Sequence, residues 1–152
     1  MSSTIATSLA SSSTLATGIT AQTIAAGADY SSSSFSPTAM SAALLDLAID
    51  YSFATTVATG TLTINACQYM NGRWDSGIPS SNGGTASPTA LPDVLVGALP
   101  IPAVTTTQST HKNDISLDPY PTTLVIHNGT GNTVTITVAA FVKGLAQSIS
   151  SP

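Results

Sequence analysis

Hydrophobic and polar residues alternate with a period of two along several stretches of this chain. From Ala43 to Phe53 every odd-numbered residue is apolar, whereas the even positions include Asp46 and Asp50. Such alternation is typical of a β-strand with one buried face. Ala and Leu also favour helices, so a helix is the alternative for this stretch. The unbroken odd-position register favours the strand.

The next alternating stretch, residues 61–70, ends at a hairpin signal. Leu62 and Ile64 alternate there with Thr and Asn, and the residues Asn71 and Gly72 separate this stretch from Arg73-Trp74. Asn-Gly between two strand-like runs is the strongest short-range indication of a β-hairpin, because both turn residues adopt positive φ. We therefore predict a hairpin at 71–72.

The clearest alternation lies near the C-terminus. Residues 122–127 and 133–143 flank a five-residue Gly-rich segment that contains Asn128, Gly129 and Gly131. After this segment, Thr occupies the odd-numbered positions from 133 to 137, and aliphatic residues occupy the even-numbered positions. The pattern predicts a second β-hairpin.

The remaining segments are rich in small or turn-forming residues. Residues 1–38 are dominated by Ser, Thr and Ala, a composition that predicts an extended arm held against its own domain or against a neighbouring copy. Residues 76–93 form a loop dense in Gly, Pro and Ser. Val94–Val104 is apolar but contains Pro100 and Pro102, which indicates an edge strand or an extended crossing segment, since Pro cannot donate to a ladder.

Together these patterns predict an all-β protein: an antiparallel β-sandwich or jelly roll with an extended N-terminal arm. No stretch predicts a helix. We expect an arm over 1–38, a sandwich domain over 39–145 and a C-terminal tail over 146–152. A chain of 152 residues is long enough to bury one core.

Charge is scarce in this composition. Lys and Arg number 3 and Asp and Glu number 7, so 7% of residues are charged where an ordinary domain has about a quarter. Ser and Thr (46 residues) supply most of the polarity. The few, scattered basic residues and the net charge of −4 argue against nucleic-acid binding. Weak repulsion between copies suits a protein packed in a fixed assembly.

The sequence also bounds the compartment of the protein. The single Cys67 excludes an internal disulfide framework. No apolar run reaches transmembrane length and the first ten residues do not resemble a signal peptide, so we expect synthesis in a cytosol, no classical export and no membrane partner.

The residues that could support catalysis or metal binding also have simpler interpretations. A hydrolase would need His111 or His127 paired with an Asp near a nucleophile, but no Gly-x-Ser-x-Gly motif is present, and Ser109-x-x-Lys112 is expected by chance in so Ser-rich a chain. His111, Asp114 and Asp118 could form a metal-binding loop, although a solvated charged loop is favoured. We predict no catalytic residue, no metal and no cofactor.

The order of elements resembles the β-sandwich structural proteins of tailed-phage virions. The resemblance rests on Thr-Leu-Thr-Ile-Asn at 61–65 followed by Asn-Gly-Arg-Trp at 71–74, and on the stretch from Leu124 to Val138. Many such proteins are capsid decoration (cement) proteins, often homotrimers on the shell, and others belong to the tail or neck. The arm at 1–38 and the loop at 76–93 have no fixed equivalent in that pattern.

The resemblance implies a structural virion protein that is made in the host cytoplasm, lies on the capsid surface and binds the major capsid protein and its own copies. The alternative is a tail, neck or fibre component that recognises a host glycan through Tyr69, Trp74 and Tyr120. Uncharged, extended segments are the expected assembly contacts, because they can add strands to a neighbour's sheet. The candidate contacts are Ile5, Leu9, Leu15, Ile19, Ile24, Val94, Val96, Leu99 and Ile101.

Overall fold

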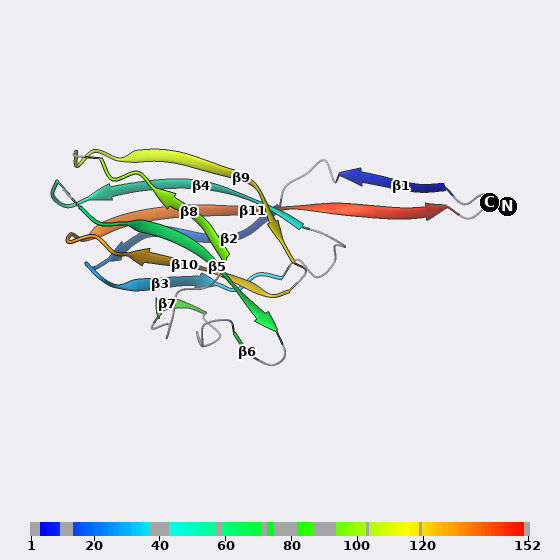
Figure 1. Cartoon of the computed structure of the whole chain (residues 1–152), viewed down its shortest axis with the longest axis horizontal. Helices are drawn as coiled ribbons and strands as arrows, with labels where there is room; N and C mark the ends of the chain where they lie inside the picture. The colour runs from blue at the N-terminus through cyan, green and yellow to red at the C-terminus, as the bar shows by residue number, and fades with distance from the viewer. Residues whose placement is uncertain are drawn as a thin grey trace.

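The computed structural model describes the backbone of residues 4–9, 14–36, 43–56, 59–70, 73–74, 82–86, 94–102, 104–118 and 120–150, and side chains within 16–36, 44–56, 59–70, 95–102, 104–118 and 120–143. The described residues contain strands and no helix, which confirms the all-β prediction (Figure 1). The strands are β1 (Thr4–Leu9), β2 (Thr14–Ile24), β3 (Asp29–Ser33), β4 (Ala43–Phe53), β5 (Leu62–Met70), β6 (Arg73–Trp74), β7 (Asn82–Ala86), β8 (Val94–Leu99), β9 (Gln108–Leu117), β10 (Thr122–Asn128) and β11 (Val134–Ser150).

Two antiparallel sheets face each other and form a jelly roll. The first has the strand order β2-β11-β4-β9 and the second has the order β8-β5-β10-β3. Successive strands of these two sheets alternate between them, except that β5 and β8 pair within the second sheet, as in the eight-stranded jelly roll built from two Greek keys. The remaining strands extend these sheets: β7 pairs with β3, β6 pairs with the end of β5, and β1 pairs with the end of β11. The predicted sandwich is confirmed.

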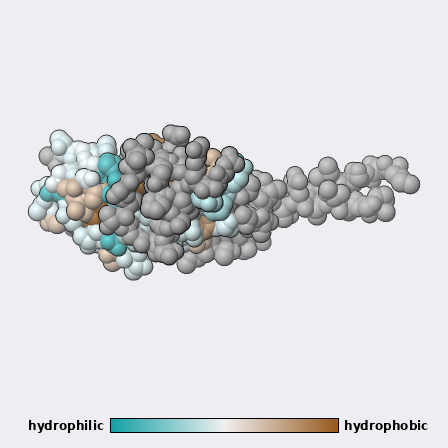
Figure 2. Space-filling view, turned by 90° about the horizontal axis from the view of Figure 1, so that it is seen from below, coloured by the Kyte–Doolittle hydropathy of each residue, from teal (hydrophilic) through white to brown (hydrophobic). Residues whose placement is uncertain are grey.

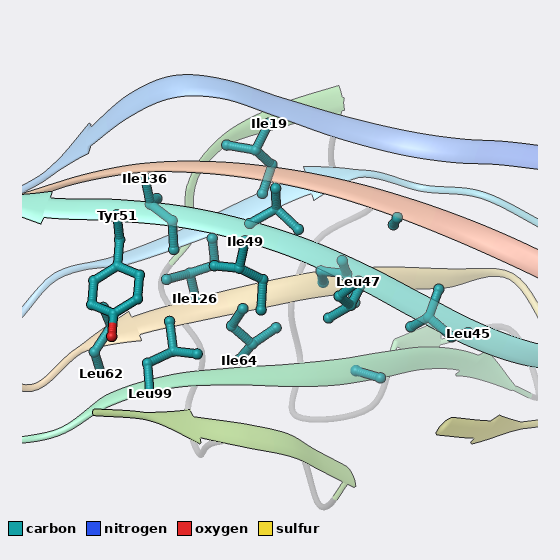
Figure 3. Packing of buried hydrophobic residues seen from close by; sticks show 14 of the residues in the cluster. Ile19, Leu45, Leu47, Ile49, Tyr51, Leu62, Ile64, Leu99, Ile126 and Ile136 are labelled. Atoms are coloured by element: carbon teal, nitrogen blue, oxygen red, sulfur yellow. The ribbon is translucent and has the colours of Figure 1, made fainter. Parts of the chain in front are cut away.

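The hydrophobic core fills the space between the two sheets (Figure 3). All odd-numbered residues of β4 from Leu45 to Phe53 are buried, as their alternation predicts, so the strand rather than the helix is correct. They face Leu62 and Ile64 of β5 and Ile126 of β10 across the core. Burying one such side chain contributes about 1.5–3 kcal/mol. Tyr51 also donates its hydroxyl to the Pro100 carbonyl oxygen at 2.7 Å, and burial raises the pKa of this phenol.

The predicted hairpin over 122–143 is wrong. β10 pairs with β3 and β5 in one sheet, whereas β11 pairs with β1, β2 and β4 in the other. The Gly-rich segment at 129–133 therefore crosses between sheets. A glycine-rich turn between two alternating strands fits a hairpin and an inter-sheet crossing equally well.

The predicted arm over 1–38 is also too long. β2 and β3 are strands of the sandwich, and Ile19 and Ile24 are each only 3% exposed within its core. Of the described residues of this arm, those of β1 lie beyond the sandwich, where they pair with Leu145–Ser150 of β11. The segment expected as a C-terminal tail is therefore a strand up to Ser150 (Figure 1).

Two local predictions agree with the strand pairing. β8 pairs with β5 alone among the described strands, which makes it the edge strand that its flanking prolines predict. β5 and β6 pair antiparallel, with Met70 opposite Arg73, as a two-residue hairpin requires. The turn residues Asn71 and Gly72 lie outside the described residues.

Candidate functional site

Four strand connections meet at one end of the sandwich, which we call the loop end: those after β2, β4, β8 and β10 (Figure 1). The buried side chain of Asn128 organises it. Its Nδ2 donates to the carbonyl oxygens of Ile24 and Ala25, both at 3.0 Å, and to that of Asn132 at 2.9 Å. Its Oδ1 accepts from the hydroxyl of Thr130 at 2.6 Å. One amide thus joins the β2–β3 turn to the β10–β11 connection.

A close backbone contact joins the β4–β5 connection to the same group. Gly60 has a φ of 115°, and a Cβ atom there would lie 2.6 Å from the carbonyl oxygen of Gly129. Asn132 Nδ2 also donates to the Thr56 carbonyl oxygen at 3.2 Å. Gly60 therefore permits an approach that no other residue allows.

The surface of the loop end carries hydroxyls and no charge. None of the four connections contains Asp, Glu, Lys or Arg. Val104, in the connection between β8 and β9, is 45% exposed. Seven threonines are also exposed here: Thr55, Thr56, Thr59, Thr61, Thr105, Thr106 and Thr107.

An Asp–His pair lies beside the loop end. Asp29 at the start of β3 faces His127 of β10 in the strand register, and Asp29 Oδ1 is 2.8 Å from His127 Nδ1. Asp29 and Tyr30 also line a shallow pocket of about 280 Å³, together with Gln22, Thr23, Ile24, Ala25 and Ala28. Sequence reasoning missed this pair because 98 residues separate its members.

The pair reproduces only part of a catalytic triad. An Asp can orient a His toward a nucleophile. A Cβ at Gly129 would lie 2.9 Å from both His127 Nε2 and Thr61 Oγ1, so glycine at 129 leaves room for both side chains. However, the described residues contain no hydrogen bond from His127 Nε2 to a hydroxyl or thiol. The geometry therefore provides an oriented imidazole without a paired nucleophile.

A cluster of charged side chains lies on the outer face of the first sheet, which contains β4, β9 and β11. Lys143 of β11 contacts both Asp46 of β4 and Asp114 of β9, the latter at 3.1 Å. The backbone N–H of Asp114, at a φ of 57°, donates to Asp46 Oδ1 at 2.9 Å. The hydrogen bond from Lys143 lowers the pKa of Asp46, and the same contact raises the pKa of Lys143. These contacts lie at the point opposite Asp46 where the pairing register of β9 with β4 shifts.

The other residues considered for chemistry are dispersed. The Ser109 hydroxyl donates to Asp50 on the outer face, whereas the Lys112 side chain lies against Gly97 of β8. The Ser109-x-x-Lys112 match therefore does not form a site. No group of three metal-ligating side chains that includes His111, Asp114 or Asp118 occurs among the described residues.

The candidate contact residues fall into three groups. Ile19, Ile24 and Leu99 are buried in the chain's own core, so their side chains cannot contact a partner and we withdraw them. Val96 and Ile101 are half-buried against that core. The side chains of Ile5, Leu9, Leu15 and Val94 lie outside the described ones, although their backbones form strands. Leu95 and Val104, both exposed, lie in the uncharged segment Leu91–Val104 that was expected to make assembly contacts, but neither was among its named contact residues.

Exposed aromatic side chains gather at the end opposite the loops. Tyr69 is 38% exposed and Tyr120 is 43% exposed, and the Tyr69 N–H donates to the Pro121 carbonyl oxygen at 2.8 Å. Trp74 lies opposite Tyr69 in the β5–β6 register, with its side chain outside the described ones. Two of the three predicted aromatics are therefore exposed on adjoining segments.

No protein family, curated protein or solved structure matches this chain. None of the described residues forms a helix long and apolar enough to span a membrane.

Proposed function

We propose that this protein is a structural component of a virion, of the capsid decoration type, which binds the shell of major capsid subunits. The observation that carries the proposal is the strand order, β2-β11-β4-β9 against β8-β5-β10-β3. Jelly rolls of this kind occur in viral capsid proteins, in lectins and in cupins. The apolar interior favours the first two classes, because Leu, Ile and Val side chains fill the space between the sheets (Figure 3).

The distribution of charge supports a bound face and a solvated face. Asp46, Asp50, Asp114 and Lys143 lie on the outer face of the first sheet, as expected of a surface in water. The connections of the loop end carry hydroxyls, the Asn132 amide and apolar groups but no charged side chain, and hydrophilic and hydrophobic residues are mixed over its surface in Figure 2. We assign the contact with the shell to the loop end, which includes the exposed Val104.

Salt dependence tests this proposal. A contact without ion pairs is only weakly screened, so virions washed in 1 M salt should keep the protein, and release should require denaturant. Release by salt alone would contradict the proposal.

A matched pair of variants localises the contact. Val104→Asp places an unpaired charge in the proposed interface and should reduce rebinding to stripped shells at least tenfold. Ser116→Asp, at an exposed position of β9, should rebind like the unmodified protein. Equal rebinding of both variants would exclude the loop end as the contact.

The exposed aromatics favour a second candidate, a tail or fibre component that binds a host glycan. Tyr and Trp faces combine apolar area with a polar tip, as sugar recognition requires. The chain has one Trp, so acrylamide quenching reports on Trp74 alone. A shielded Trp74 would remove the strongest part of this platform. Protection of an accessible Trp74 by a glycan would favour the glycan-binding function.

A further inference from the structure

A bulge in β2 places a polar side chain on the core side of the first sheet. Two residues separate Ile19 from Gln22, whereas one residue separates their partners on β11. Ala21 accommodates the extra residue with a φ of 45°, which residues other than glycine rarely adopt. Because directly opposed residues share a face, Gln22 lies on the same face as its buried partner Ile136. Bulges that redirect a side chain are common next to active sites.

Tyr30 lines the same pocket from the second sheet. It lies opposite Ile126 in the register of β3 with β10, and Ile126 is fully buried, so Tyr30 is also on the core side of its sheet. Gln22 and Tyr30 are both half-buried, and both line the pocket of about 280 Å³. Side chains from the two sheets therefore converge on one pocket where β2 is followed by β3.

The polar lining of this pocket has unused hydrogen-bonding atoms. Gln22 donates its Nε2 to the Thr23 carbonyl oxygen at 3.0 Å, and its Oε1 has no partner among the described residues. The Tyr30 hydroxyl makes no hydrogen bond to a described residue either. Much of the remaining lining is aliphatic: Ile24, Ala25 and Ala28. A few polar groups on an apolar surface are typical of a small-molecule site.

The charge and size of the pocket restrict its ligand. No lining residue is Lys, Arg or His, so nothing in the lining compensates the charge of a phosphate or carboxylate group. The carboxylate of Asp29, which also belongs to the lining, further disfavours an anion. The volume is at the lower limit of ligand pockets, about 300–1,000 Å³, so one ring fills it. A neutral ring with several hydroxyls and an apolar face meets these conditions.

We propose that this pocket binds a single uncharged sugar ring through Gln22 and Tyr30. Hydroxyls of the sugar donate to Gln22 Oε1 and form hydrogen bonds with the Tyr30 hydroxyl, while the C–H face of the ring packs on the aliphatic lining. This inference goes beyond the proposed function, because it concerns the free protein and requires no contact with a shell. It is also distinct from the exposed aromatics Tyr69 and Tyr120, which lie at the opposite end of the sandwich.

Ligand-detected NMR and calorimetry on the free full-length protein test the site. The probes are the methyl glycosides of glucose, galactose, mannose and N-acetylglucosamine, and we expect at least one of them to bind with a millimolar dissociation constant. Methylguanidinium and p-cresol probe a cationic and an aromatic ligand in the same assay. Binding of either of these in preference to every glycoside, or no detectable binding of any glycoside, would overturn the proposal.

Substitutions locate the binding. Gln22→Ala and Tyr30→Phe each remove one hydrogen-bonding group, and each should raise the dissociation constant of the bound glycoside by at least about fivefold. Tyr120→Phe removes the same hydroxyl at the opposite end of the sandwich and should leave the dissociation constant unchanged. Thermal denaturation checks that the three variants are folded, and Gln22→Ala decides the question if Tyr30→Phe is not. An unchanged affinity of Gln22→Ala, or a loss of affinity in Tyr120→Phe alone, would overturn the proposal.

Discussion

At the loop end, a buried asparagine ties two strand connections together, whereas at the opposite end β1 and residues 145–150 pair beyond the sandwich. The loop end combines side-chain hydrogen bonds, a glycine-dependent close contact and the adjoining core. The two-stranded ribbon of β1 and residues 145–150 has backbone pairing, and no described strand pairs with either of its outer edges. The difference teaches that long-range side-chain hydrogen bonds close one end of the sandwich, whereas the other end continues as backbone pairing of two strands.

The largest expected effect is at Asn128. Asn128→Ala removes the buried amide that bonds to the carbonyl oxygens of Ile24 and Ala25 and to the Thr130 hydroxyl, of which Ala25 and Thr130 each keep one other partner. Unsatisfied buried polar groups are costly, so we expect the free energy of unfolding to fall by about 3 kcal/mol. Chemical denaturation measures this. If Asn128→Ala lowered the free energy of unfolding as little as removal of residues 1–9 does, the proposed difference in stability between the two ends would be wrong.

A glycine pair tests the close backbone contact. Gly60→Ala brings a Cβ within 2.6 Å of the Gly129 carbonyl oxygen at a φ that disfavours side chains, so about 2 kcal/mol of stability should be lost. Gly131→Ala, in the adjoining connection, meets nothing within 4 Å and serves as the control. Equal stabilities of the two variants would show that the connections do not approach as closely as described.

The ribbon should contribute little to the stability of the monomer. Removing residues 1–9 eliminates β1 but no described core residue, so we expect the free energy of unfolding to change by less than about 1 kcal/mol. A loss comparable to that of Asn128→Ala would contradict the division between the two ends.

The smallest effect concerns the charges that hold the irregularity of β9. The pKa of Asp46 is lowered below its ordinary value of 3.8, chiefly by the hydrogen bond from Lys143. Its stabilisation is therefore present above about pH 4 and is lost as the pH falls through the lower folded pKa. Asp46→Asn should cost less than about 1 kcal/mol at pH 7 and should flatten the acid side of the stability curve. An unchanged acid slope would show that this pair does not stabilise the edge.

Alternation was sufficient to predict the strands with one buried face. β4 and β5 follow their apolar positions, and the prolines around β8 correctly predict an edge. Composition failed at the N-terminus because serine can be buried when it is bonded: the Ser32 hydroxyl accepts from the Leu124 N–H, 92 residues away, at 3.0 Å. Local sequence patterns give no information about hydrogen bonds between residues that are so far apart in the chain.

The hairpin prediction failed for a related reason. The strands before and after Gly129 alternate equally well in either topology, and the bonds from Asn128 to Ile24 and Ala25 belong to a turn about a hundred residues away. The Asp29–His127 pair is equally distant in sequence and has no motif. The absence of charge from the four connections, in contrast, can be seen in the sequence once the fold is known.

The most direct test of the central claim is the density of this protein in a cryo-electron microscopy reconstruction of the intact virion. The account predicts the jelly roll on the capsid surface, with its loop end on the shell. A particle without this protein on the shell, or one with the loop end directed into solvent, would contradict the account.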